Sequence, residues 1–346
     1  MIEAVFAIPG DITTPTGGYA YDREILRRIG DHGVVLRHLE LPGSFPFPTA
    51  DDLEATARLL GGRDGTLLID GLAFGALPAG ILSRIKARIV ALVHHPLALE
   101  TGLSGDEAER LRILERGALK TASAVVVTSA ATAAILVSNY GVPREAIAVA
   151  VPGTAPARRA AGSGSGHALL AVGSVIPRKG YEVLVEALAR LGDRPWSLTI
   201  VGALDRAPGY VRSLRARIDA AGLSDRIRFT GAVPGHALSS FYDKADIFVL
   251  ASHFEGYGMV LTEALAHGLA IVSTTGGAAA ETLPDAAALK VPAGDPMALA
   301  GALASLLDDG ERRRALADVA LSHARHLPDW SQTAATVAAQ LKHGSP

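Results

Sequence analysis

The stretch 246-DIFVLASHFEGYGMVLTE-263 combines a short apolar run, a glycine-rich turn and a periodic apolar segment. The run Ile247–Leu250 predicts a buried parallel strand, and residues 259–266 predict a helix that stops at Gly268. A strand, a glycine turn and a helix in this order direct unpaired backbone N–H groups toward an anion. Because a helix N-terminus carries about half a positive charge, phosphate is the favoured ligand.

Two carboxylates bracket the start of this helix. Glu255 lies on the turn, and Glu263 lies one helical turn further on, where it could accept hydrogen bonds from a vicinal diol such as a ribose. A carboxylate beside a phosphate requires compensating cations. Arg178 and Lys179 are the candidates, because they follow one predicted strand and precede a helix, where they could bind a diphosphate from the side opposite the Glu255 turn. The alternatives are solvated glutamates on an ordinary turn and a surface ion-pairing role for the two basic residues.

The pattern Ser-x-x-Glu-Gly-Tyr-Gly-x-x-x-x-Glu-Ala-x-Ala-x-Gly at residues 252–268 resembles the donor-site motif of the retaining GT-B glycosyltransferases of family 4. The segment Gly-x-x-x-Pro-Arg-Lys-Gly at residues 173–180 resembles the family's diphosphate-binding segment. Residues 226–231, Arg-Ile-Arg-Phe-Thr-Gly, resemble the strand before its base-binding loop. The resemblance extends over essentially the whole chain and is densest from residue 168 to residue 285.

This resemblance implies an α/β protein of the GT-B fold, with two Rossmann-like domains facing across a cleft and a C-terminal helix that crosses back to the first domain. The implied activity is transfer of a hexose, with retention of configuration, from a nucleotide-diphospho-sugar to an acceptor hydroxyl. UDP is favoured over GDP. The alternative is a catalytically silent nucleotide-sugar-binding protein of the same fold, since a fold does not fix a function.

The resemblance also implies roles for individual residues. It places Glu255 at the transferred sugar, Glu263 at the ribose, and Glu281 at the sugar or the base edge. The catalytic candidates are Glu255, His94, Arg178 and Lys179. The donor-binding candidates are Gly18, Gly173, Arg178, Lys179, Val233, Gly256, Tyr257, Gly258, Met259, Val260 and Glu263.

The first half of the chain supplies the acceptor-side candidates Gly17, Asp70 and His95. Gly17 and Gly18 open a helix after the first strand, where open α/β sheets bind ligands; an ordinary loop-to-helix junction remains the alternative. Asp70 ends a strand, which is also the setting of a common Asx turn. The neighbours His94 and His95 end another strand and point to opposite sides. We favour His94 as the histidine that faces the ligand; local hydrogen bonding of both remains the alternative.

Composition narrows the function classes. The chain has 346 residues, no cysteine and a formal net charge of −2, which argues against disulfides, thiolate metal sites and nucleic acid as the main partner. No apolar run is long enough to span a bilayer, and the N-terminus reads as a strand rather than a signal peptide. We expect a cytoplasmic protein. No Asp-x-Asp triplet ends a strand, so we expect neither a metal nor another cofactor.

Domain boundaries follow from a change in composition. Residues 1–156 are expected to form an N-terminal acceptor-binding domain, and the Gly/Ser-rich residues 157–167 a flexible linker. Residues 168–326 are expected to form the nucleotide-sugar domain, and residues 327–346 the terminal helix. A Pro/Phe-rich loop at 41–48 and the basic stripe Arg112, Arg116 and Lys120 favour a lipid acceptor and peripheral contact with anionic membrane. A sugar acceptor and a solvated helix face remain open.

Overall fold

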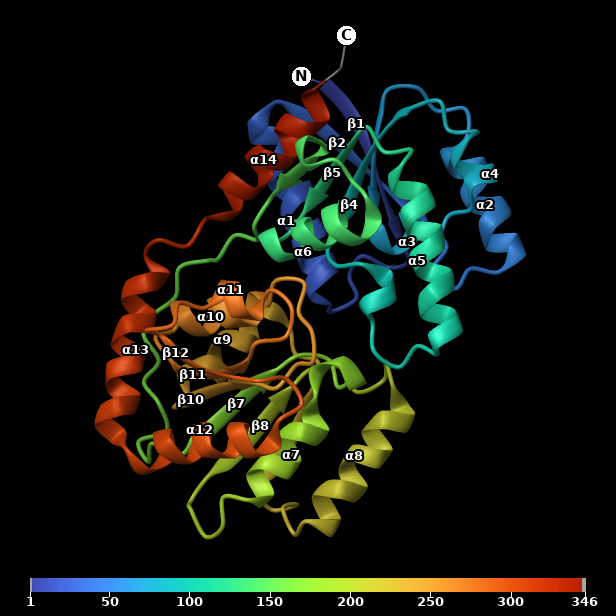
Figure 1. Ribbon diagram of the computed structural model, residues 1–346. Coiled ribbons are helices and arrows are strands. Elements are labelled where there is room, and N and C mark those ends of the chain that lie inside the picture. The colour runs from blue at the N-terminus through green and yellow to red at the C-terminus, as the bar shows by residue number, and fades with distance from the viewer. Residues whose placement is uncertain (1, 344–346) are drawn as a thin grey trace. The chain divides into compact units, whose positions relative to one another are not determined.

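The computed structural model describes residues 2–343, and these divide into two compact units. The first unit contains the residues up to Gly153 together with those from Pro328 onward, and the second contains Thr154–Leu327. Figure 1 shows both units as sheets covered by helices. No helix among the described residues is long and apolar enough to cross a membrane.

The first unit is built on a six-stranded parallel sheet with strand order β2-β1-β3-β4-β5-β6. Its central strands are buried along their whole length, which is why their sequences are continuous apolar runs. The strands are β1 (Ile2–Pro9), β2 (Val34–Leu41), β3 (Thr66–Asp70), β4 (Arg88–Val93), β5 (Ala124–Val127) and β6 (Ile147–Val149). The helices are α1 (Gly17–Arg28), α2 (Ala50–Leu60), α3 (Gly71–Phe74), α4 (Ala79–Leu82), α5 (Gly105–Leu119) and α6 (Ala130–Ile135), with short helical turns η1 (Ile29–His32), η2 (Leu97–Leu99), η3 (Leu136–Tyr140) and η4 (Arg144–Ala146).

The second unit repeats this architecture with strand order β12-β11-β10-β7-β8-β9. Alternate residues of β7 enter different cores: Leu169 packs with α7, α8 and α12, whereas Leu170 packs with α10. Helices therefore cover both faces of this sheet. The strands are β7 (Ala168–Val172), β8 (Ser197–Val201), β9 (Ile227–Gly231), β10 (Ile247–Leu250), β11 (Ala270–Thr274) and β12 (Ala288–Val291). The helical segments are η5 (Pro177–Lys179), α7 (Tyr181–Ala189), α8 (Pro208–Ala220), α9 (Gly235–Asp243), α10 (Met259–Ala266), α11 (Ala279–Thr282), α12 (Pro296–Asp308) and α13 (Gly310–Ala324).

The C-terminal helix α14 (Trp330–Lys342) belongs to the first unit and packs against α1 (Figure 1). The Trp330 ring meets the Tyr21 ring edge-on with 5.6 Å between centroids. The Thr333 hydroxyl donates a hydrogen bond to the carbonyl of Val151 over 2.7 Å. The prediction of two Rossmann-like domains with a terminal helix on the first is confirmed.

Residues 157–167 differ from the expected flexible linker. They form no regular element, yet they belong to the second unit and are hydrogen-bonded to the rest of it: the Gly162 amide donates to the Asp243 carbonyl over 2.8 Å, and the Ser163 amide donates to the Asp246 carboxylate over 3.1 Å. The Gly/Ser composition gives the backbone the freedom to reach these acceptors. The division between the units falls after Gly153, three residues before the boundary expected at 156.

Candidate active site

The site in the second unit is centred on Glu255, on the turn between β10 and α10. The Lys179 Nζ atom lies 2.6 Å from Glu255 Oε1, and Arg178 Nη1 lies 3.4 Å from Glu255 Oε2. Arg178 also donates a hydrogen bond to the carbonyl of Phe254 over 2.8 Å. The Ser252 hydroxyl donates to Glu255 Oε1 over 2.5 Å. The carboxylate is therefore held by two cations and a hydroxyl.

Two glycines explain why these residues meet. Gly180 ends η5 in the left-handed conformation, with φ of 61°, and a Cβ added there would lie 2.2 Å from the Ala251 carbonyl oxygen. No side chain fits between these backbones, so the Arg178–Lys179 segment lies directly against the end of β10. Gly258 is also left-handed, with φ of 90°, and caps α10 without a side-chain partner for the helix N–H groups. The start of α10 thus presents backbone donors beside the ion pairs.

The position of the two basic residues differs from the sequence-based expectation. We expected Arg178 and Lys179 on the side of a phosphate opposite the Glu255 turn; the structure places both side chains on Glu255 itself. The reason is electrostatic, because the Glu255 residue is only 5% exposed and a buried carboxylate requires nearby cations. Burial raises the pKa of Glu255, but the charges of Lys179 and Arg178 outweigh this and hold the pKa below its ordinary value.

Glu263 has a different environment, one helical turn into α10. The Tyr242 hydroxyl donates a hydrogen bond to Glu263 Oε2 over 2.7 Å. Burial raises the pKa of Glu263 above its ordinary value, and this hydrogen bond opposes the rise. The ring of Tyr242 is buried in the core, so its hydroxyl is a fixed donor.

The other donor-side candidates of the second unit surround these two carboxylates. Gly173 follows β7, and a Cβ added there would lie 3.0 Å from the Lys179 Cε atom. Val233 is partly buried in the loop before α9. The Tyr257 carbonyl accepts a hydrogen bond from the Thr282 hydroxyl over 2.6 Å, which ties the turn to α11, where Glu281 lies. Gly256, Met259 and Val260 complete the turn and the first residues of α10.

The first unit has its own polar cluster at the carboxyl ends of its strands. The His94 Nε2 atom lies 3.2 Å from Asp22 Oδ1 on α1 and 3.4 Å from Asp70 Oδ2 at the end of β3. A Cβ added at Gly18 would lie 3.4 Å from His94 Cδ2, so the start of α1 lies close against the imidazole. The helix itself begins at Gly17, capped by the Thr16 side chain.

The two adjacent histidines have separate partners. His94 enters the Asp22–Asp70 cluster, whereas His95 Nε2 lies 3.5 Å from Glu100 Oε2. This agrees with the alternation of an extended chain. Within residues 2–343, Asp22, Asp70 and His94 are also the group whose ligand atoms lie near enough to one another, within 4.8 Å, for a metal ion to be considered. Their contacts are those of charged hydrogen bonds, and we assign no metal to them.

Sequence reasoning missed three residues of these clusters. Asp22 is fully buried, and no sequence-based prediction assigned it to a site. Its position was a usable signal, because Gly18, Asp22, Ile25 and Ile29 recur at helical spacing on one otherwise apolar face. Ser252 was recognised only as part of the motif, and the Tyr242 hydroxyl was not anticipated, because no local pattern pairs it with Glu263.

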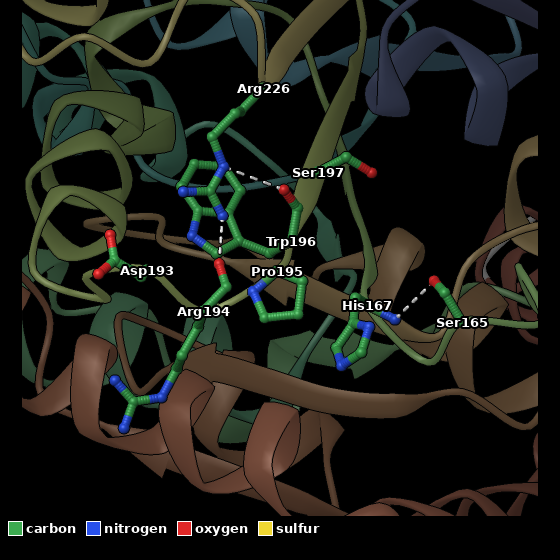
Figure 2. A pocket seen from close by; sticks show the side chains of 8 residues that line it. All are labelled: Ser165, His167, Asp193, Arg194, Pro195, Trp196, Ser197 and Arg226. Atoms are coloured by element: carbon green, nitrogen blue, oxygen red, sulfur yellow. Dashed lines mark hydrogen bonds between the residues drawn. The ribbon is translucent and has the colours of Figure 1, made fainter.

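One hollow in the second unit lies away from Glu255. It has a volume of about 490 Å³ and is lined by Ser165, His167, Asp193, Arg194, Pro195, Trp196, Ser197 and Arg226 (Figure 2). The Arg226 guanidinium lies 3.7 Å from the Trp196 ring centroid and donates hydrogen bonds to the carbonyls of Trp196 and Arg194. These residues lie near the starts of β7, β8 and β9, at the opposite edge of the sheet from Glu255. The guanidinium therefore ties neighbouring segments together.

Two units, each a six-stranded parallel sheet covered by helices, define a GT-B protein. The second unit carries a basic site at the start of a helix. Family models agree: "Glycosyltransferase Family 4" matches residues 15–158, and "Glycosyl transferases group 1" matches residues 158–322. The chain is 30% identical over 349 residues to the D-inositol 3-phosphate glycosyltransferase of Salinispora tropica, covering 87% of this chain and 70% of that protein. The chain belongs to the group 1 glycosyltransferases of family 4.

Other relatives and solved structures show the same likeness. The D-inositol 3-phosphate glycosyltransferase of Corynebacterium urealyticum is 32% identical, over 66% of this chain and 58% of its own length. The chain spans 40% to 64% of the length of this relative and two similar ones. Sucrose-phosphate synthase from Thermosynechococcus elongatus superposes with a TM-score of 0.82 at 20% identity over 98% of both chains. HepE from Anabaena, in complex with UDP and glucose, gives a TM-score of 0.76 at 18% identity, covering 97% of this chain and 99% of that one.

Proposed function

We propose that this protein transfers a hexose from a nucleotide-diphospho-sugar, with UDP as the favoured nucleotide, to an acceptor hydroxyl with retention of configuration. The observation that carries the proposal is the charge at the Glu255 turn. Arg178 and Lys179 bring two positive charges to one carboxylate, and the start of α10 adds backbone donors. The group has a net positive charge, which suits the diphosphate of such a donor.

The comparisons support this choice of donor. The printed description of HepE names UDP and glucose as its ligands, and another structure of HepE is in complex with UDP-glucose. Both share the fold of this chain at low sequence identity. The donor-site pattern of residues 252–268, in contrast, is carried by the present sequence itself.

The chemical step follows from these charges. Negative charge grows on the diphosphate as it leaves, and Arg178 and Lys179 would stabilise that charge. Charge-assisted hydrogen bonds contribute about 1.5–3 kcal/mol each, and the helix start adds about 0.3–1 kcal/mol. The acceptor hydroxyl attacks on the face from which the diphosphate leaves, and a phosphate oxygen takes its proton. Glu255 contacts the transferred sugar, Glu263 binds the ribose, and no metal is used.

The acceptor is a sugar, a polyol phosphate or a lipid-linked hydroxyl. The relatives named D-inositol 3-phosphate glycosyltransferase favour a polyol phosphate. The lipid alternative rests on the exposed basic residues of α5 and on Phe47, whose exposed ring lies 5.6 Å from the Arg110 guanidinium. A lipid acceptor would place a cytoplasmic protein in peripheral contact with anionic membrane.

Calorimetric titration with UDP and with GDP tests the donor, and release of hexose from UDP-sugars without an acceptor tests turnover. We expect UDP to bind more tightly than GDP and slow hydrolysis of at least one UDP-sugar. Inositol phosphate and anionic vesicles, supplied in separate reactions, then distinguish the acceptors. Donor binding with neither hydrolysis nor transfer from any donor would instead support the catalytically silent alternative.

A further inference from the structure

Two carboxylates converge on one nitrogen of the His94 imidazole. Asp22 Oδ1 and Asp70 Oδ2 lie 3.2 Å and 3.4 Å from Nε2, and they come from different elements, α1 and β3. The Asp70 side chain is fixed from its other oxygen, since Oδ1 accepts the Leu72 amide hydrogen over 2.8 Å at the start of α3. The backbone at the start of α3 therefore anchors Asp70, and the Nε2 edge of the ring faces both carboxylates.

Burial makes this arrangement strongly dependent on charge. Asp22 is fully buried and Asp70 is 2% exposed, and Asp22 Oδ2 has no hydrogen-bond partner among residues 2–343. Burial raises the pKa of Asp22 to about 6, opposed by the nearby His94. Burial alone would lower the pKa of His94, but the charges and hydrogen bonds of Asp22 and Asp70 outweigh it and raise that pKa to about 10. A positive imidazolium is the form whose charge both carboxylates stabilise.

The other edge of the ring is available to a ligand. The hydrogen bonds of the His94 ring run through Nε2, no residue in the described part of the chain contacts Nδ1 as a partner, and the side chain keeps 21% exposure. The charged and titratable neighbours are Asp22, Asp70, the Tyr21 ring at 5.2 Å between centroids, and Arg23, which acts on Asp22. Apart from Arg23, a cation, these neighbours are acids, and the two nearest are carboxylates.

We propose that Asp22 and Asp70 are positioning residues that hold His94 as an imidazolium, with Nδ1–H presented as a donor to a hydroxyl oxygen of a bound sugar or polyol. His94 is then a cationic hydrogen-bond donor and not a general base, because its proton is already in place. The identity of the ligand rests on the proposed glycosyltransferase function; the protonation of His94 does not.

Nitrogen-15 NMR of histidine-labelled full-length protein tests the protonation directly. We expect His94 to stay doubly protonated at neutral pH, and Asp22→Asn to lower its pKa by about 1–3 units, the effect of removing one adjacent opposite charge. Asp70→Asn should also lower the pKa of His94, and it keeps an oxygen that can accept the Leu72 amide hydrogen. It therefore replaces Asp22→Asn in this test if Asp22→Asn does not fold. His38, which is exposed on β2, is the internal control: at each pH its ring signals should be the same in the wild type and in both variants.

The pH profile of transfer adds a readout that a merely structural role would not give. In Asp22→Asn we expect kcat to fall as the pH rises through the new pKa and to recover at lower pH, whereas KM for the UDP-sugar stays close to wild type. A His94 that titrates near its ordinary value in the wild type, Asn variants that leave it unmoved, or one divalent ion per chain that is lost in Asp22→Asn would each overturn the proposal. Absence of any transfer, with the NMR result intact, would refute only the proposed function.

Discussion

The carboxyl edges of the two sheets carry clusters of opposite composition. In the first unit, two carboxylates face one histidine; in the second, two cations face one carboxylate. With His94 protonated, the first cluster has one excess negative charge, and the second has one excess positive charge. Both clusters use burial to strengthen the ion pairs. The same sheet architecture thus carries the cluster that we propose binds an anion in one unit and, in the other, the cluster that we propose binds neutral hydroxyl groups.

The largest effect is expected from Glu255→Gln, because it removes the acid of the second cluster while leaving both cations. Transfer should fall by about 100-fold, the order seen when one preorganised catalytic group is lost. UDP should bind at least as tightly as to the wild type, since Arg178 and Lys179 lose their internal partner. Single-turnover transfer and calorimetry measure the two effects. Glu186→Gln removes an exposed acid paired with Arg190 and should change neither. Weaker UDP binding in Glu255→Gln would contradict a phosphate role for the cations.

Lys179→Ala tests the opposite half of the same cluster. Loss of a charge-assisted hydrogen bond, about 1.5–3 kcal/mol, should raise the UDP dissociation constant about 10- to 100-fold. Arg194→Ala is the matched control, because Arg194 pairs with Asp308 near the opposite edge of the same sheet. Calorimetry with UDP compares the variants at a temperature where each is folded. If Lys179→Ala leaves the dissociation constant unchanged, the cluster does not bind the diphosphate.

Glu263→Gln should have a smaller effect. Replacing a charged acceptor by a neutral amide weakens its hydrogen bonds to a ribose, so we expect the UDP dissociation constant to rise by about tenfold or less. Tyr242→Phe, which removes only the hydroxyl that orients Glu263, should weaken binding less. A UDP analogue lacking the ribose hydroxyls should bind the wild type and Glu263→Gln equally. A persistent difference with that analogue would place Glu263 elsewhere on the donor.

The sequence was sufficient for the architecture and for most of the second cluster. Buried parallel strands have continuous apolar sequences, and the glycines Gly256 and Gly258 mark the turn before α10 in the local sequence. Two features depended on tertiary contacts. The direct pairing of Lys179 with Glu255 arises because Gly180 lets two backbones touch, and sequence patterns do not give that distance. Asp22 contacts His94, 72 positions further along the chain, and only its place on an apolar helix face hinted at burial.

The opposite charges of the clusters also predict opposite pH dependences of stability. The folded-state pKa of His94 is raised, so its contribution is complete below the unfolded value of about 6.5 and is lost as the pH rises through about 10. The folded-state pKa of Glu255 is lowered, so its contribution is present above the unfolded value of about 4.3 and is lost as the pH falls through the folded pKa. The first unit should weaken in alkali and the second in acid.

The chain offers a separate reporter for each unit, because its two tryptophans are buried in different units: Trp330 in the first and Trp196 in the second. Trp196→Phe leaves fluorescence from the first unit alone, and Trp330→Phe leaves that of the second.

The thermal unfolding midpoint reported by Trp330 should fall as the pH rises in alkali, and His94→Gln should make this fall less steep. The midpoint changes by about 2–4 °C for each kcal/mol of stability. In the same way, Glu255→Gln should make the fall of the thermal unfolding midpoint reported by Trp196 less steep as the pH is lowered. Because Glu115 in the first unit has a pKa raised by burial to about 8, the comparison with His94→Gln belongs above that pH. Equal slopes in wild type and His94→Gln there would show that the imidazolium does not stabilise the first unit.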